Sequence, residues 1–69
     1  MQDSTLKISL AAARVNARLT QEEVAKKLGK NKQTIVNWEN GRTTIDTANF
    51  IALCKLYGIP QGYIFLPNK

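Results

Sequence analysis

The sequence predicts an all-α protein built as a compact bundle of four to five short helices. Apolar residues recur at helical spacing, helix caps and glycines separate these stretches, and no stretch alternates apolar and polar residues over a useful length. With 69 residues, of which 43% are hydrophobic, the chain has the size and composition of one small globular domain. We therefore expect a single domain over residues 1–69.

The first two helices are indicated by capping residues followed by apolar residues at helical spacing. The first is expected over about residues 5–17, with Ser4 as its N-cap. Its apolar side consists of Leu6, Leu10, Ala13 and Ala17. Thr20 and Glu23 have the spacing of a capping box, in which each side chain binds the other's backbone N–H. This box begins a second helix, which is expected to end at Gly29.

The third and fourth helices are indicated in the same way. Asn31 is the expected N-cap of a third helix that runs to about Asn40, and Asp46 is that of a fourth helix that ends at Gly58. The apolar side of the fourth helix consists of Phe50, Leu53, Cys54 and Tyr57. A last short helical turn is expected within residues 60–66.

The third helix has two chemically different sides. At 100 degrees per residue, Ile35 and Trp38 share one side, which is expected to pack on the core. The opposite side carries Lys32, Gln33, Val36, Asn37 and Asn40. The preceding helix is short, turns tightly at Gly29 and has the small Ala25 where the two axes approach, so residues 20–40 have the arrangement of a helix-turn-helix. The second helix of that motif enters the major groove of DNA.

Charge and composition restrict the classes of function. A net charge of +5 favours an anionic partner such as nucleic acid or acidic lipid, and five cations lie around the motif at Lys26, Lys27, Lys30, Lys32 and Arg42. The chain has no histidine and one cysteine, so the usual zinc sites cannot be assembled and the commonest general base is absent. We therefore expect no enzymatic activity, no metal and no cofactor, and the residues indicate no small-molecule ligand.

Cysteine use and hydropathy predict where the protein works. Cys54 is the only cysteine, which excludes an internal disulfide and favours a reducing cytoplasm. The N-terminus lacks a signal-peptide pattern, and the longest apolar stretch, residues 50–54, is too short to cross a bilayer. A cytoplasmic protein with no membrane contact is expected.

The segment LTQEEVAKKLGKNKQTIVNWENGR resembles the phage-repressor-like helix-turn-helix family, which includes Cro, lambda-repressor-like and other XRE proteins. The matching positions are Leu19, Thr20, Gln21, Val24, Ala25, Leu28, Gly29, Thr34, Ile35, Trp38, Glu39, Asn40 and Gly41. The likeness extends over nearly the whole chain and implies a lambda-repressor-like DNA-binding domain of prokaryotic or phage type. It also implies sequence-specific binding of double-stranded DNA by a repressor or Cro-like regulator, as a homodimer on a palindromic operator.

The resemblance also assigns roles to individual residues. It implies that base edges are read by Lys32, Gln33, Val36 and Asn37, and that DNA phosphates are bound by Gln21, Lys30, Thr34, Asn40, Arg42 and Thr43. Lysine suits guanine and an amide suits adenine, so the chemistry agrees. For Val36 two interpretations stay open, contact with a thymine methyl group or packing at the edge of the core. Arg14 and Glu39 match a structural ion pair of the family.

Departures from the family pattern leave some features open. Arg18 stands where glycine is common, so either its φ is positive and strained or the turn is built differently. Lys30 replaces an apolar residue of the turn, so its stem should pack while its ammonium reaches water. The chain is a complete small regulator or the DNA-binding part of a longer one. The alternative function is a protein-interaction module that keeps the fold but does not bind DNA.

Overall fold

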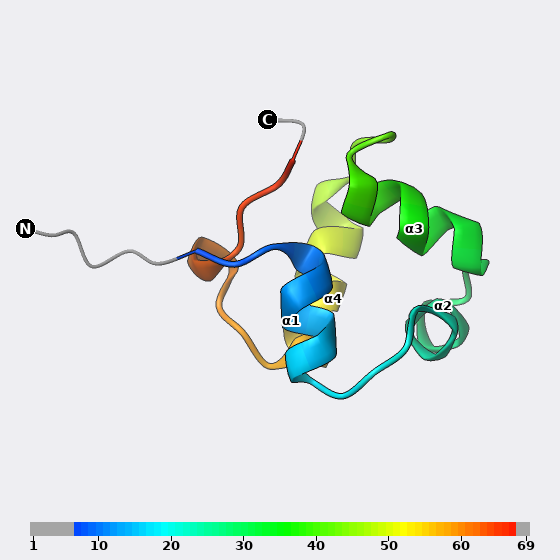
Figure 1. Ribbon diagram of the computed structural model, residues 1–69, viewed down its shortest axis with the longest axis horizontal. Helices are drawn as coiled ribbons and strands as arrows, with labels where there is room; N and C mark the ends of the chain where they lie inside the picture. The colour runs from blue at the N-terminus through cyan, green and yellow to red at the C-terminus, as the bar shows by residue number, and fades with distance from the viewer. Residues whose placement is uncertain (1–6, 68–69) are drawn as a thin grey trace, which may run out of the picture.

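Four α-helices and one 3₁₀ helix make up most of residues 7–67, the part of the chain that the computed structural model describes (Figure 1). The elements are α1 Leu10–Asn16, α2 Gln21–Leu28, α3 Lys32–Asn40, α4 Thr47–Tyr57 and η1 Gln61–Tyr63. The prediction of an all-α fold is confirmed. None of these described helices has the length and apolar content that crossing a membrane requires.

Three helices begin at the caps that the sequence predicts. The side chains of Thr20, Asn31 and Asp46 each accept a hydrogen bond from the backbone N–H three residues later. Thr20 also forms the expected capping box: its N–H donates to Glu23 Oε1 at 2.8 Å, and the Glu23 N–H donates to Thr20 Oγ1 at 3.0 Å. Local hydrogen bonds therefore set the first residues of α2, α3 and α4.

The first helix begins later than predicted. Ser4 lies outside the described residues, but the described residues before Leu10 are not helical. Ser9 is the actual N-cap, and its Oγ accepts the Ala12 N–H at 3.0 Å. The expected start at residue 5 is therefore wrong, and α1 is a helix of 7 residues.

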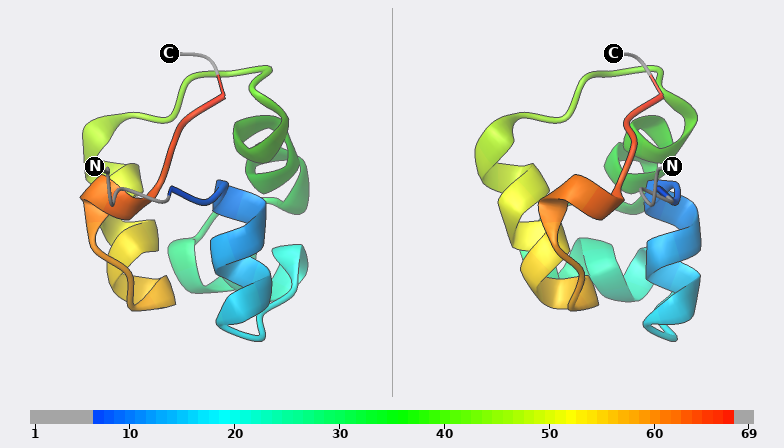
Figure 2. Two further views of the ribbon diagram at one scale, coloured as in Figure 1. Left: turned by 60° about the vertical axis from the view of Figure 1, so that its left-hand side comes forward. Right: turned by 90° about the vertical axis from the view of Figure 1, so that its left-hand side faces the viewer.

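A backbone bridge to the C-terminal segment explains why α1 cannot start earlier. Ile8 and Ile64 form an isolated parallel β-bridge. The Ile8 N–H donates to Tyr63 O at 2.8 Å, and the Phe65 N–H donates to Ile8 O at 3.1 Å. Figure 2 shows the first blue segment beside the orange and red C-terminal segment. Because Ile8 is extended here, its backbone is not available to a helix.

All four α-helices contribute to one hydrophobic core. α2 packs mainly on α3, and α1 contacts both α3 and α4. The buried side chains are Leu10, Ala13, Val24, Ala25, Ile35, Trp38, Ile45, Leu53, Cys54, Tyr57 and Ile64. Cys54 is therefore a small core residue, and burial raises the pKa of its thiol.

Among the described residues with positive φ, Arg18 and Gly41 have this conformation for different reasons. Arg18, between α1 and α2, has φ 63°, so the strained form of this turn is the one present. A side chain in this conformation costs about 1–2 kcal/mol relative to the right-handed region. Gly41 ends α3 at φ 75°, and a Cβ built there would lie 3.1 Å from two side-chain atoms of Pro67. Glycine at position 41 thus serves both the turn and the close packing.

The hydroxyl of Tyr57 is buried and has no hydrogen-bond partner among the described residues. Burial and, to a lesser degree, the negative charge of Glu39 raise the pKa of Tyr57 from 10.0 to about 12. An unpartnered buried hydroxyl costs about 1–3 kcal/mol, so it opposes folding while the rest of the ring favours it.

Replacing this hydroxyl should stabilise the protein. We expect Tyr57→Phe to raise the free energy of unfolding by about 1 kcal/mol, measured by urea unfolding at neutral pH. The folded state holds the Tyr57 proton more tightly than the unfolded state does. The stability that depends on protonated Tyr57 is therefore fully present below pH 10 and is lost as the pH rises towards about 12. The variant should lose less stability over that interval. Tyr63→Phe is the matched control, since Tyr63 is exposed, and equal effects of the two changes would contradict this account.

Candidate nucleic-acid interface

A tight turn joins α2 to α3 and brings the two helices into contact. Gly29 adopts the left-handed conformation with φ 68°, and the Lys30 N–H donates to Ala25 O at 2.8 Å. Ala25 is 4% exposed, which shows how closely its surroundings pack on this small side chain. In Figure 1, α2 is seen almost end-on with α3 crossing above it. This is the geometry of a helix-turn-helix.

The two sides of α3 have the environments expected from the sequence. Ile35 and Trp38 are buried, at 1% and 7% exposure. Lys32 and Gln33 are exposed, and Val36 and Asn37 are partly exposed. The helix thus turns four side chains away from the core in its first two turns.

Gln33 and Asn37 bind each other along this outer side. Gln33 Nε2 donates to Asn37 Oδ1 at 3.0 Å. The bond uses one of the two amide hydrogens of Gln33 and leaves its carbonyl oxygen and second hydrogen free. These two remaining groups form the donor and acceptor pair that an adenine edge requires in the major groove. The contact therefore orients Gln33 without using up its capacity to read a base.

Val36 differs from its polar neighbours on α3. It is half-buried but does not belong to the partly buried hydrophobic side chains that pack against the core, namely Ile8, Ala17, Leu19, Leu28, Phe50, Leu56, Ile59 and Leu66. Of the two interpretations left open by the sequence, this position favours contact with an external apolar group.

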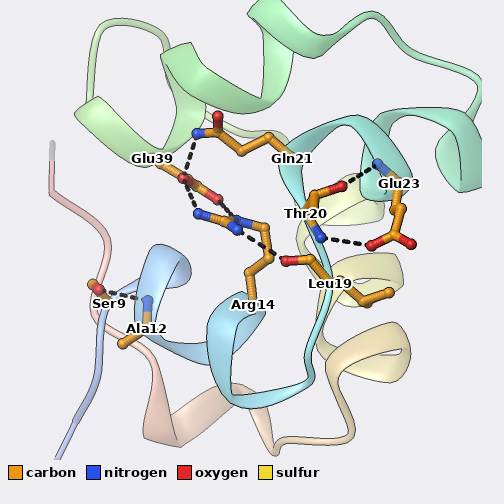
Figure 3. A network of polar contacts seen from close by, with 8 residues as sticks. All are labelled: Ser9, Ala12, Arg14, Leu19, Thr20, Gln21, Glu23 and Glu39. Carbon is orange, nitrogen blue, oxygen red and sulfur yellow. Dashed lines mark hydrogen bonds and ion pairs between the residues drawn. The ribbon is translucent and has the colours of Figure 1, made fainter.

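A polar network joins α1, α2 and α3 behind the outer side (Figure 3). Arg14 Nε and Glu39 Oε2 form an ion pair at 2.7 Å, and the two side chains are only 15% and 6% exposed. Arg14 Nη1 also donates to Leu19 O at 2.9 Å, and Gln21 Nε2 donates to Glu39 Oε1 at 2.9 Å. One carboxylate therefore receives donors from two other helices.

The network sets the orientation of the Gln21 amide. Glu39 offers only acceptors, so Nε2 of Gln21 must face it and its carbonyl must point elsewhere. Gln21 is also the first residue of α2, where backbone N–H groups and the helix dipole favour an anion. A second Nε2 hydrogen remains for such an anion. Because Arg14 offsets the charge of Glu39, a phosphate nearby would meet less repulsion.

The other expected phosphate contacts lie around the ends of α3. Lys30, Asn40, Arg42 and Thr43 are exposed. Thr34 is half-buried, and its hydroxyl donates to Asn31 Oδ1 at 2.9 Å, so it reinforces the cap of α3. The structure thus brings Lys30 and Thr34 to the start of this helix and the other three to its end.

Comparison with protein families identifies this arrangement. The family model described as helix-turn-helix matches residues 10–64. The chain belongs to the XRE-type helix-turn-helix family. Members of this family are DNA-binding regulators, and catalysis is not typical of them. No curated protein and no solved structure matches the chain.

Within residues 7–67, no three side chains of the metal-ligating types His, Cys, Asp and Glu come together. On the outer side of α3, Lys32 and Gln33 are exposed, and the exposed cations Lys30 and Arg42 flank this helix. Membership of the XRE-type family makes the protein a DNA-binding regulator in general terms.

Sequence reasoning missed two features of this surface. It gave no signal for the bond between Gln21 and Glu39, whose partners lie 18 positions apart on different helices. It also placed Lys26 only in the general basic cluster, and gave no signal that Lys26 lines a cleft with Lys30 and Lys32. The Gln33 and Asn37 contact was visible in principle, because residues four apart on a helix are neighbours.

Removing one partner of the ion pair between Arg14 and Glu39 should destabilise the fold strongly. We expect Arg14→Ala to lower the free energy of unfolding by about 3–5 kcal/mol, since it leaves the Glu39 carboxylate buried without its cation. Urea unfolding followed by circular dichroism measures this. The exposed Arg18 provides the control, and Arg18→Ala should change stability much less.

A second substitution distinguishes charge from lost packing. Adding Glu39→Gln to Arg14→Ala removes the stranded charge and should recover part of the loss. A loss no larger than that of Arg18→Ala, or a double variant that is less stable than Arg14→Ala, would contradict this explanation.

Proposed function

We propose that the protein is a sequence-specific transcriptional regulator of the repressor or Cro-like type that reads double-stranded DNA through the major groove. The main observation in support of this proposal is that α3 buries Ile35 and Trp38 while its outer side presents Lys32, Gln33 and Asn37. A helix placed in this way by a helix-turn-helix enters the groove with its N-terminal residues towards the base edges. All three side chains lie in the first two turns of α3.

Each of these side chains has a matching base edge. Gln33, held by Asn37, presents one donor and one acceptor, which is the pattern complementary to N7 and N6 of adenine. Lys32 carries donors for N7 and O6 of guanine. Val36 supplies an apolar contact for the methyl group of thymine. Each good bidentate pair contributes about 1–3 kcal/mol of discrimination against the wrong base.

Phosphate contacts on either side would fix α3 in the groove. In this proposal Gln21 binds one phosphate through its free amide hydrogen and the start of α2. The remaining contacts are Lys30, Thr34, Asn40, Arg42 and Thr43. Such contacts set affinity and register and carry little sequence information.

A homodimer on a palindromic operator completes the proposal. The C-terminal segment exposes two aromatic side chains, Tyr63 at 57% and Phe65 at 47%, which provide apolar surface for a second copy. Two copies related by a twofold axis would place their α3 helices in half-sites about one helical turn apart.

Selection of bound duplexes from a random pool tests this function. We expect recovered sites with two inverted half-sites separated by about one helical turn, and binding that weakens steeply with salt. Recovery of one half-site without symmetry would contradict the proposed dimer but would still support base reading by α3. No salt-sensitive binding to any duplex would favour the protein-interaction module instead.

Two alanine variants separate reading from positioning. We expect Gln33→Ala to relax the preference at one base pair per half-site, because the amide that pairs with that base is lost. Arg42→Ala should weaken binding to all sequences alike, because it removes a phosphate contact. Fluorescence anisotropy against operator and single-substituted operators measures both. The reverse pattern would reject the roles assigned to these residues.

A further inference from the structure

An open cleft lies between α2 and the start of α3. Its volume is about 470 Å³, and its lining residues are Glu22, Ala25, Lys26, Lys30 and Lys32. The cations come from three different places, since Lys26 is in α2, Lys30 is in the turn and Lys32 is the first residue of α3. The arrangement of α2, the turn and α3 therefore brings three lysines to the lining of one cleft.

The charge of the cleft is largely uncompensated. Across residues 7–67 the one ion pair joins Arg14 to Glu39, so none of the three lysines is in an ion pair there. Lys30 does lie near enough to Asp46 to contribute to its lowered pKa, although the main cause is the hydrogen bond from Asn49. Glu22 is the only acid in the lining. Three positive charges against one negative charge favour an anion.

The position of the cleft identifies which anion would reach it. In a helix-turn-helix the first helix crosses the DNA backbone and the second lies in the groove. The cleft borders both helices, so it would face the edge of the groove, where the sugar-phosphate backbone runs. We propose that the cleft binds one backbone phosphate through Lys26 and Lys30. This inference rests on the proposed function and adds Lys26 to the contacts that the family resemblance implies.

Glu22 has the opposite effect in this site. Its carboxylate lies in the same lining as the two lysines and repels the phosphate that they attract. It lies four residues before Lys26 on α2, the orientation in which the two charges also attract each other. Removing the charge of Glu22 therefore strengthens phosphate binding and leaves Lys26 more available.

Charge-neutral variants test the cleft with a selected operator and a non-operator duplex of equal length. We expect Lys26→Gln to weaken binding to both duplexes by about two- to fivefold, the effect of one exposed ion pair. Glu22→Gln should strengthen binding to both. Lys27→Gln is the matched control, because Lys27 is exposed, is adjacent on α2 and does not line the cleft, so it should have a smaller effect. Thermal unfolding confirms that each variant is folded.

The salt dependence of DNA binding shows how many phosphates Lys26 and Lys30 contact together. Lys26→Gln together with Lys30→Gln should lower the slope of log affinity against log salt by about 0.9, the value for one phosphate. A decrease of about 1.8 would mean two separate phosphates and would overturn the shared site.

Further outcomes separate this site from the proposed function. If wild type binds duplexes and Lys26→Gln behaves like Lys27→Gln, the cleft is not a phosphate site and the proposed function stands. A change of preference at one base pair would also overturn it, because a phosphate carries no sequence information. Absence of wild-type binding to any duplex would overturn both.

Discussion

The burial of Ile35 and Trp38 of α3 in the core is the constraint on which the proposed DNA-binding surface depends. These two side chains share one side of the helix, so placing them in the core leaves only one orientation for the rest. Lys32 and Gln33 then face outwards, and the hydrogen bond to Asn37 further orients the amide of Gln33. A small domain has a small hydrophobic core, and here the core contacts that stabilise α3 also set its orientation.

Glu39 adds orientation to this packing. Its carboxylate is almost fully buried and receives donors from Arg14 and Gln21, so α1 and α2 are tied to α3 at defined angles. Burying charges is expensive, and the ion pair by itself is weak support for stability. Its value lies in geometry, because it fixes the Gln21 amide at the start of α2. A polar network of this kind favours one arrangement of the three helices over others.

Two other features of the domain lower its stability. Arg18 holds a left-handed backbone conformation that glycine would adopt without strain, and the Tyr57 hydroxyl is buried without a partner. The Arg18 conformation costs about 1–2 kcal/mol and the Tyr57 hydroxyl about 1–3 kcal/mol, which are sizeable amounts in a domain whose net stability is small. The strained turn leads into α2 and is held by local backbone hydrogen bonds, because the Arg18 N–H donates to Val15 O at 2.9 Å and the Leu19 N–H donates to Arg14 O at 3.2 Å.

The sequence by itself determined what depends on neighbours along the chain. Caps at Thr20, Asn31 and Asp46 bind N–H groups three residues away, and the two sides of α3 follow from its period. Only the tertiary structure decided features whose partners are remote in sequence. The bridge between Ile8 and Ile64 moved the start of α1, and the hydrogen bond between Gln21 and Glu39 joins α2 to α3 across 18 positions. Helical spacing contains no information about such contacts, because packing between elements creates them.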